Sequence, residues 1–82
     1  MTKDKKMELL GTPACHLCEL AEALLEACVQ AGYPLAYTKV DIACDDVLFA
    51  RYGLSIPVLR DGARELHWPF GPRELVAFCE AA

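Results

Sequence analysis

The sequence predicts one α/β domain with the element order β-α-β-α-β-β-α, in which a four-stranded mixed sheet is flanked by helices. Three observations predict it: a helical apolar stripe separates two strand-like segments, a strand led by proline follows them, and a turn signal joins that strand to a fourth. The 82 residues fit one domain, and 55% of them are hydrophobic, as the dense core of so short a chain requires. We therefore expect a single domain over 1–82, with 1–5 as a flexible tail.

The first half of the chain predicts a strand, a long helix and a second strand. The apolar run from Met7 to Leu10 is stopped by Gly11-Thr12-Pro13, which is typical of a strand that enters a turn. Helical spacing then predicts a core-facing stripe made of Leu17, Leu20, Ala21, Leu24, Leu25 and Cys28. Gly32 ends this helix, and alternating apolar residues over 35–42 predict the second strand. Because one crossover helix joins them, the two strands should be parallel.

The second half predicts four shorter elements. They are a helix over 47–52, a strand over 56–60, a strand over 65–68 and a helix that starts at Gly71-Pro72. Asp45 and Asp46 suit the N-terminus of the short helix, and Asp61-Gly62 is a hairpin signal between the two strands. Proline is favoured at the first turn of a helix, so Pro72 fits the start of the last one. The inward residues of that last helix are predicted as Leu75, Val76, Phe78 and Cys79.

Charge and hydropathy narrow the classes of partner. Twelve acidic and eight basic residues give a net charge of −4 and no basic stripe for a phosphate backbone, so no nucleic acid partner is expected. Lys3, Lys5 and Lys6 are interrupted by Asp4 and are expected to belong to a solvated tail. The apolar run that follows is too short for a signal peptide or a membrane span, so we expect no membrane partner and a cytoplasmic location.

The five cysteines fall into different settings. An odd count without an export signal disfavours a structural disulfide framework. Cys28 and Cys79 lie on apolar helical stripes and are expected to be small buried hydrophobes. Cys44 precedes the short helix in a loop-like segment, where it is either an incidental thiol or an accessible third thiol, and we favour the incidental role.

Cys15 and Cys18 form a C-x-x-C between the end of the first strand and the first turn of the long helix. Unpaired N–H groups and the helix dipole stabilise an anion there, so Cys15 is the candidate nucleophile and should have a lowered pKa. Cys18 lies nearly one helical turn further on and is the candidate resolving thiol, because it can attack a mixed disulfide formed at Cys15. His16 either stabilises the Cys15 thiolate as a cation or is an exposed helical histidine.

A metal site is the alternative use of these side chains. The nominal ligands are Cys15, His16, Cys18, Cys44 and His67. Structural zinc usually takes four ligands from two close pairs, and the sequence has no second close pair. We therefore expect no metal.

Together these features resemble the thioredoxin fold, and more closely its small glutaredoxin-like branch. The resemblance covers 7–79 and rests on three segments: Thr12 to Cys18, Val40 to Ile42 and Ser55 to Leu59. The short chain with Trp68-Pro69-Phe70 is similar to small glutaredoxin-like proteins of bacteria.

The resemblance implies the site around the cysteines. It implies that the peptide bond before Pro57 is cis and lies beside the redox pair, whereas the residues alone favour an ordinary trans strand opener. It also implies that the backbone of Ile56 pairs with a bound thiol substrate like an added strand. Thr12 and Pro13 are further substrate-binding candidates in the loop before Cys15.

Two positions depart from glutaredoxins that use glutathione. Those proteins typically carry a lysine before the first cysteine and Gly-Gly followed by aspartate before the last helix, which hold the glutathione carboxylates. Here Gly11 to Ala14 contains no cation, and Phe70 to Glu74 contains one glycine and a glutamate. Gly71 and Arg73 remain candidate contacts for glutathione or a partner. We expect no resident cofactor, and glutathione is a candidate co-substrate that these departures disfavour.

The predicted function is that of a thiol–disulfide oxidoreductase that uses Cys15 as nucleophile and Cys18 as resolving thiol. The alternative is a thioredoxin-fold module that docks peptides or a partner protein beside Pro57, with thiols that sense redox state or are vestigial. The expected partner is a thiol or disulfide protein or a low-molecular-weight thiol, and the chain is expected to be a monomer.

Overall fold

The computed structural model describes residues 6–33 and 35–80, so the predicted tail over 1–5 lies outside the described residues. The elements are β1 (Lys6–Gly11), α1 (His16–Gln30), β2 (Ala36–Asp41), the 3-10 helix η1 (Ile42–Cys44), α2 (Asp46–Tyr52), β3 (Val58–Asp61), β4 (Arg64–His67) and α3 (Pro72–Glu80). The predicted order is confirmed, with η1 added. In this described part of the chain, no helix is long and apolar enough to cross a membrane.

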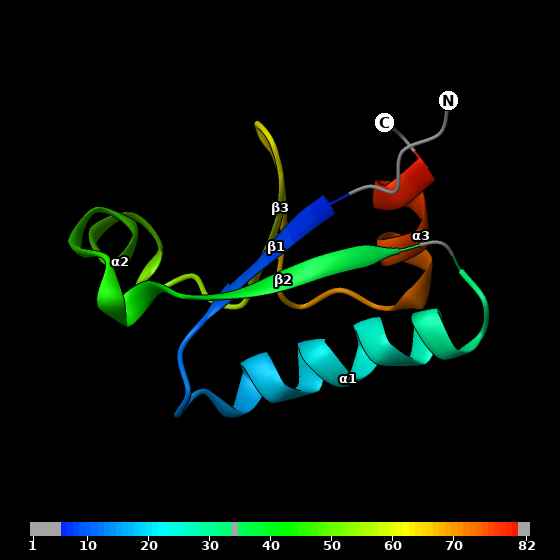
Figure 1. Ribbon diagram of the computed structural model, residues 1–82, viewed down its shortest axis with the longest axis horizontal. Coiled ribbons are helices and arrows are strands. Elements are labelled where there is room, and N and C mark those ends of the chain that lie inside the picture. Colours follow the sequence, from blue (N-terminus) through cyan, green and yellow to red (C-terminus); the bar gives the residue numbers. More distant parts are fainter. Residues whose placement is uncertain (1–5, 34, 81–82) are drawn as a thin grey trace.

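The four strands form one mixed sheet in the order β2-β1-β3-β4 (Figure 1). As predicted, β1 and β2 are parallel, whereas β3 runs antiparallel to both β1 and β4. The central strand β1 is therefore paired on both sides, with Leu10 opposite Val40 of β2 and Val58 of β3. This double pairing fixes the end of β1, from which the chain leads to the cysteines.

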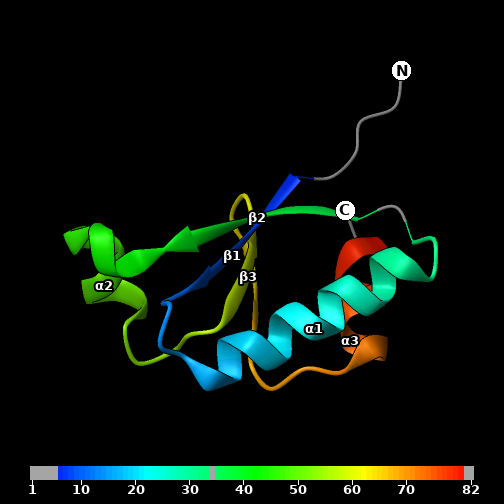
Figure 2. The same cartoon turned by 60° about the horizontal axis from the view of Figure 1, so that its bottom comes forward.

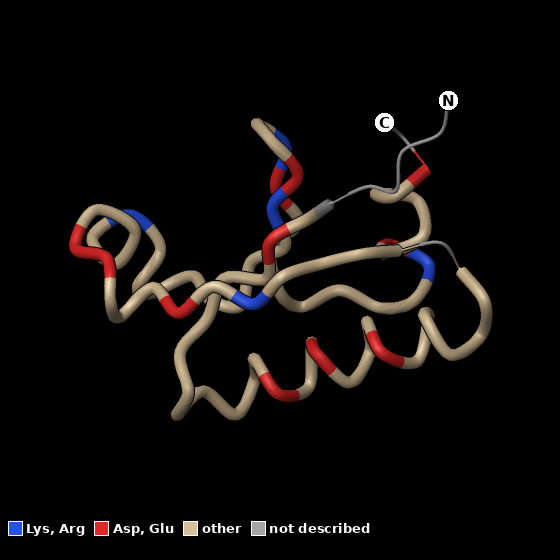
Figure 3. Tube along the Cα trace, viewed as in Figure 1, with Lys and Arg blue, Asp and Glu red and all other residues tan. Residues whose placement is uncertain are grey.

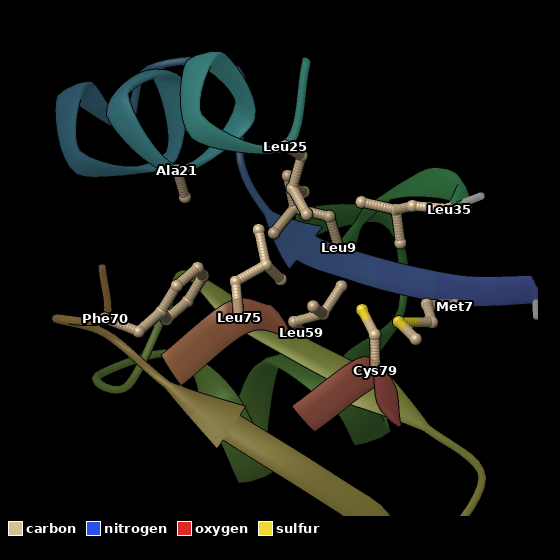
Figure 4. Close-up of a cluster of buried hydrophobic side chains, with 9 residues drawn as sticks. All are labelled: Met7, Leu9, Ala21, Leu25, Leu35, Leu59, Phe70, Leu75 and Cys79. Atoms are coloured by element: carbon tan, nitrogen blue, oxygen red, sulfur yellow. The ribbon is translucent and has the colours of Figure 1, made fainter. Parts of the chain in front are cut away.

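One face of the sheet is covered by α1 and α3, which lie on the same side of it (Figures 1 and 2). Because successive residues of a strand point to opposite faces, Met7 and Leu9 of β1 point toward these two helices. There they join the main core, shown in Figure 4, which consists of Met7, Leu9, Ala21, Leu25, Leu35, Leu59, Phe70, Leu75 and Cys79. This core holds α1 against the sheet.

The opposite face carries a smaller core and polar pairs. Leu10, Ile42, Tyr52 and Val58 form the smaller core, to which α2 contributes Tyr52. Further along the same face, Arg60 donates two hydrogen bonds to Glu8 Oε1, from Nε at 2.9 Å and from Nη2 at 2.7 Å. The Tyr52 hydroxyl donates to the carboxylate of Glu65, and this bond is the main reason that the pKa of Glu65 is lowered. Ion pairs and hydrogen bonds therefore cover this part of the sheet.

The apolar stripe predicted on the long helix is partly wrong. Leu17 and Leu20 are 45% and 44% exposed. The buried residues of α1 are Cys18, Ala21 and Leu25, and Leu24 and Cys28 pack partly buried against the main core. Successive helical residues point roughly 100° apart, so a helix turned to bury Cys18 leaves its neighbour Leu17 at the margin of the packed face. The cysteine thus belongs to the buried stripe, and the two leucines lie outside it.

Several predicted strand boundaries also shift by one or two residues. The second strand ends at Asp41 and not at 42, because the Asp41 side chain accepts a hydrogen bond from the Ala43 N–H at 2.9 Å and starts η1. The third strand begins at Val58 and not at 56, since pairing with β1 begins at Val58. The fourth strand spans Arg64–His67 and so leaves out Trp68. The short helix agrees closely, with Asp45 as its N-cap.

The burial of Leu25 and the exposure of Leu20 can be tested by truncation. Leu25→Ala removes a fully buried side chain and should lower the free energy of unfolding by roughly 2–5 kcal/mol. Leu20→Ala makes the same chemical change on the same helix and should cost less than about 1 kcal/mol. Urea denaturation of both variants under reducing conditions measures the difference, and an equal loss would contradict this orientation of α1.

Candidate functional site

A tight turn leads from β1 to Cys15 at the start of α1. The Cys15 N–H donates to the Thr12 carbonyl at 3.2 Å and closes the turn. Cys15 has extended backbone angles, with φ −96° and ψ 109°, and its carbonyl accepts the helical bond from Glu19 N–H at 3.2 Å. It is therefore the N-cap residue of α1, and the C-x-x-C begins the helix, as the sequence predicts.

Cys15 and Cys18 form a disulfide, with their Cα atoms 5.2 Å apart. The Cys18 N–H also donates to Cys15 Sγ at 3.0 Å. Cys15 is half-buried, whereas only 8% of Cys18 is exposed. The sulfur that an incoming molecule can reach is therefore that of Cys15, and the helix directs a backbone N–H at it.

Gly11 makes room for Cys18. A Cβ atom at Gly11 would lie 2.7 Å from Cys18 Sγ and 3.1 Å from Cys18 Cβ. Real Cβ atoms do not approach a neighbouring atom to 2.7 Å, so a larger residue at the end of β1 would force Cys18 or the strand to shift. From sequence, Gly11 is predicted only as part of a turn, and its place immediately before the loop to the C-x-x-C is the signal that could indicate this contact.

The strand register brings Pro57 toward the same place. Leu10 pairs with Val58, so continuing the antiparallel register places Pro57 opposite Gly11. Pro57 is buried, Ile56 is half-buried, and the peptide bond between them is cis. The segment expected to bind substrate thus lies beside the glycine that contacts Cys18.

His16 is the first residue of α1, and its side chain is directed to solvent. Its side chain is 79% exposed, and its Nδ1 lies 3.8 Å from Glu19 Oε1. This geometry matches the expectation of an exposed helical histidine more closely than that of a thiolate partner.

Gly71 immediately precedes α3, and Arg73 lies in the first turn of that helix. The Gly71 N–H donates to Glu74 Oε1 at 2.9 Å. Together with the N–H of Glu74 itself, this bond lowers the pKa of the Glu74 carboxyl. The N–H of Gly71, one of the two candidate contacts for glutathione or a partner, is therefore already bonded to a carboxylate of its own chain.

A cavity of about 330 Å³ opens beside the disulfide. Both cysteines line it, together with Thr12 and Pro13. Its other lining includes four charged residues that are not predicted as site residues from sequence, namely Glu19, Glu22, Lys39 and Asp41. The parallel pairing of β1 and β2, which sets Gly11 opposite Asp41, brings the end of β2 to the redox pair. The predicted parallel pairing of the first two strands is thus the feature of the sequence that could have indicated these residues.

The other three cysteines lie outside the disulfide and differ in exposure. Cys79 is buried and Cys28 half-buried, while Cys44 is exposed. Cys44 Sγ donates weakly to Asp41 Oδ2 at 3.7 Å. Within residues 6–33 and 35–80, no group of three or more His, Cys, Asp or Glu side chains could hold a metal ion.

The sheet order, the helix positions and a cysteine pair at the N-terminus of α1 define a thioredoxin-like α/β protein of the glutaredoxin-like class. The model of the family described as "Glutaredoxin-like domain (DUF836)" matches residues 6–80, and the chain belongs to that family. A comparison with curated proteins gives no match.

Solved structures agree with this assignment. The chain is 43% identical to the X-ray structure of target protein XcR50 from X. campestris, with a TM-score of 0.76 and coverage of 93% of this chain and 97% of that one. A solution structure of the same target gives 43% identity, a TM-score of 0.74 and coverage of 93% and 94%. The solution structure of protein Ne2328 from Nitrosomonas europaea shares the fold, with 23% identity, a TM-score of 0.76 and coverage of 96% and 95%.

The contact of Gly11 with Cys18 can be tested by a double-mutant cycle. Gly11→Ala should lower the free energy of unfolding of the reduced protein by roughly 1–3 kcal/mol, because the added methyl group overlaps Cys18 Sγ. In a Cys18→Ala background the sulfur is gone, and the same substitution should cost clearly less. Urea denaturation of the four proteins gives the coupling energy; an identical cost in both backgrounds would show that the two residues do not compete for space.

Proposed function

We propose that this protein is a thiol–disulfide oxidoreductase that cycles between the Cys15–Cys18 disulfide and the dithiol. The observation that carries the proposal is the N-cap position of Cys15, whose half-buried sulfur accepts the Cys18 N–H at 3.0 Å. A thiolate at a helix N-terminus is stabilised by such donors and by the helix dipole, and the thiolate is the form that attacks disulfides. The site therefore suits thiol–disulfide exchange.

The proposed cycle divides the two roles by exposure. The Cys15 thiolate attacks one sulfur of a substrate disulfide, so that a mixed disulfide forms and the first substrate thiolate leaves. Cys18, buried next to Gly11, then attacks Cys15 Sγ, releases the second substrate thiolate and closes the Cys15–Cys18 bridge. Two electrons pass from the dithiol to the substrate. Because both thiols belong to one helical turn, the second attack is intramolecular and fast.

Substrate positioning is assigned to the segments on either side of the pair. In this proposal the backbone of Ile56, next to Pro57, pairs with an extended substrate, and Thr12 and Pro13 contact it from the loop before Cys15. The register that sets Pro57 opposite Gly11 supports this assignment. We further propose that the chain acts in the cytoplasm as a monomer and holds no resident cofactor.

Replacing the nucleophile tests the proposed activity. In turnover of a model disulfide, fed by a reductase or by glutathione, Cys15→Ser should fall to the rate of uncatalysed exchange, because no other thiol has the N-cap position. Cys18→Ser should accumulate a mixed disulfide at Cys15, which mass spectrometry detects. The matched control is Cys44→Ser, which removes an exposed thiol outside the pair and should keep the wild-type rate. Equal rates for wild type and Cys15→Ser would leave the alternative, a module that docks peptides beside Pro57.

The stabilisation of the thiolate has a separate test. Alkylation of Cys15 by iodoacetamide, followed against pH by mass spectrometry, should give an apparent pKa below the value of about 8.5 for a free thiol. The same cysteine in urea-unfolded protein loses the helix and should return to about 8.5. A folded value at or above the unfolded one would remove the helix N-terminus as the cause of reactivity.

A further inference from the structure

The cavity beside the disulfide has a marked charge imbalance. Glu19 and Glu22 of α1 line it together with Asp41 at the end of β2. Among the described residues that line the cavity, Lys39 is the one Lys or Arg, and its Nζ lies 3.3 Å from Glu22 Oε2. The ammonium is therefore paired, and two carboxylates remain in excess.

The helix that lines the cavity provides no cation that would offset this imbalance. Figure 3 shows acidic residues along α1 and no lysine or arginine on it. An anionic group that approached the disulfide through this cavity would thus meet carboxylates with no free cation among the lining residues.

From this geometry we infer that the cavity selects small disulfides that carry an ammonium group close to the S–S bond. The inference rests on the proposed exchange at Cys15 and specifies its substrate class. A volume of about 330 Å³ lies at the lower end of small-molecule sites, so a compact substrate fits it. The ammonium lies against Glu19 and Asp41 while Cys15 reaches the substrate sulfur.

The chemical step is ordinary thiol–disulfide exchange. The Cys15 thiolate forms a bond to one sulfur of the cationic disulfide, the substrate S–S bond breaks, and an aminothiolate leaves and takes up a proton. Cys18 then closes the protein disulfide and releases the second aminothiol, so the reduced protein supplies both electrons. One turnover of the pre-reduced protein needs no other reductant.

The test compares three small disulfides of matched length that differ in charge. Cystamine carries two ammonium groups, bis(2-hydroxyethyl) disulfide is neutral, and dithiodiglycolate carries two carboxylates. Each single-turnover rate with reduced protein is divided by the rate of the same disulfide with free 2-mercaptoethanol, which removes differences in intrinsic reactivity. One carboxylate about 4 Å from a ligand charge changes affinity about fivefold even in water. The normalised rate should therefore fall at least about fivefold from cystamine to the neutral disulfide, and at least about fivefold again from the neutral disulfide to dithiodiglycolate.

Charge variants localise the selectivity. Glu19→Gln and Asp41→Asn should each lower the ratio of the normalised rate with cystamine to that with dithiodiglycolate at least about fivefold. Asp41→Asn keeps an oxygen that can accept the hydrogen bond from the Ala43 N–H. Lys39→Gln removes the cation and should raise the ratio. The matched control is Glu26→Gln, which makes the same change on α1 outside the cavity lining and should leave the ratio unchanged. Taking the ratio within each variant cancels any change in the reactivity of Cys15.

Ionic strength gives an independent readout. The Debye length falls from about 30 Å at 0.01 M to about 3 Å at 1 M, so the ratio should shrink toward unity as salt is added. The inference would be overturned if the normalised rates did not fall from the cationic through the neutral to the anionic disulfide, or if Glu26→Gln lowered the rate ratio as much as Glu19→Gln. Either result would leave the oxidoreductase proposal standing. If the reduced wild type and Cys15→Ser reacted equally with all three disulfides, the proposed function itself would fail.

Discussion

The packing of α1 on the central strand is the constraint on which the site depends. The buried face of α1 includes Cys18, Ala21 and Leu25, and the main core behind it contains Met7 and Leu9 of β1. With this face fixed, Cys18 lies against the sheet, while Cys15 lies at the open end of the helix. The same apolar contacts that stabilise the fold therefore decide which of the two sulfurs is exposed and which is enclosed.

Backbone approach at the end of β1 extends this constraint to the rest of the site. Cys18 keeps its position without strain because Gly11 has no Cβ, and Gly11 lies between two strand neighbours. On one side the register continues to Pro57 of the segment before β3, and on the other Gly11 pairs with Asp41 of β2. The cysteine pair is thus bordered by the segment assigned to substrate backbone and by the cavity with its carboxylates.

The periodicities of the sequence predict much of this arrangement. The element order, the parallel pairing of the first two strands and the position of the C-x-x-C all follow from local patterns. The orientation of the long helix does not, because Leu17 and Cys18 are both acceptable in a buried stripe and only the packed sheet distinguishes them. The short helix η1 does not follow from these patterns either, because it depends on a local hydrogen bond from the Ala43 N–H to the Asp41 side chain.

The cavity is the part of the site that is hardest to predict. Its charged residues come from α1 and from β2, which are brought together only by the pairing of the strands. Their closeness in space therefore cannot be predicted from their separation in the sequence. Two side-chain pairs join α1 to β2: Glu22 is paired with Lys39, and Glu26 accepts a hydrogen bond from the Tyr37 hydroxyl at 2.5 Å. Both pairs join the helix to an edge strand, and the first lies in the lining of the cavity.

The acidic lining and the helix N-terminus act on Cys15 in opposite directions. Carboxylates disfavour a nearby thiolate, whereas the Cys18 N–H at 3.0 Å and the helix dipole favour it. A hydrogen bond to a charged group contributes about 1.5–3 kcal/mol, while two charges about 4 Å apart in water interact by roughly 1 kcal/mol. The carboxylates of Glu19 and Asp41 belong to exposed residues, so solvent screens their repulsion, and the directed hydrogen bond prevails at the sulfur. Their charge instead acts on whatever enters the cavity, where it discriminates between substrates without removing the nucleophile.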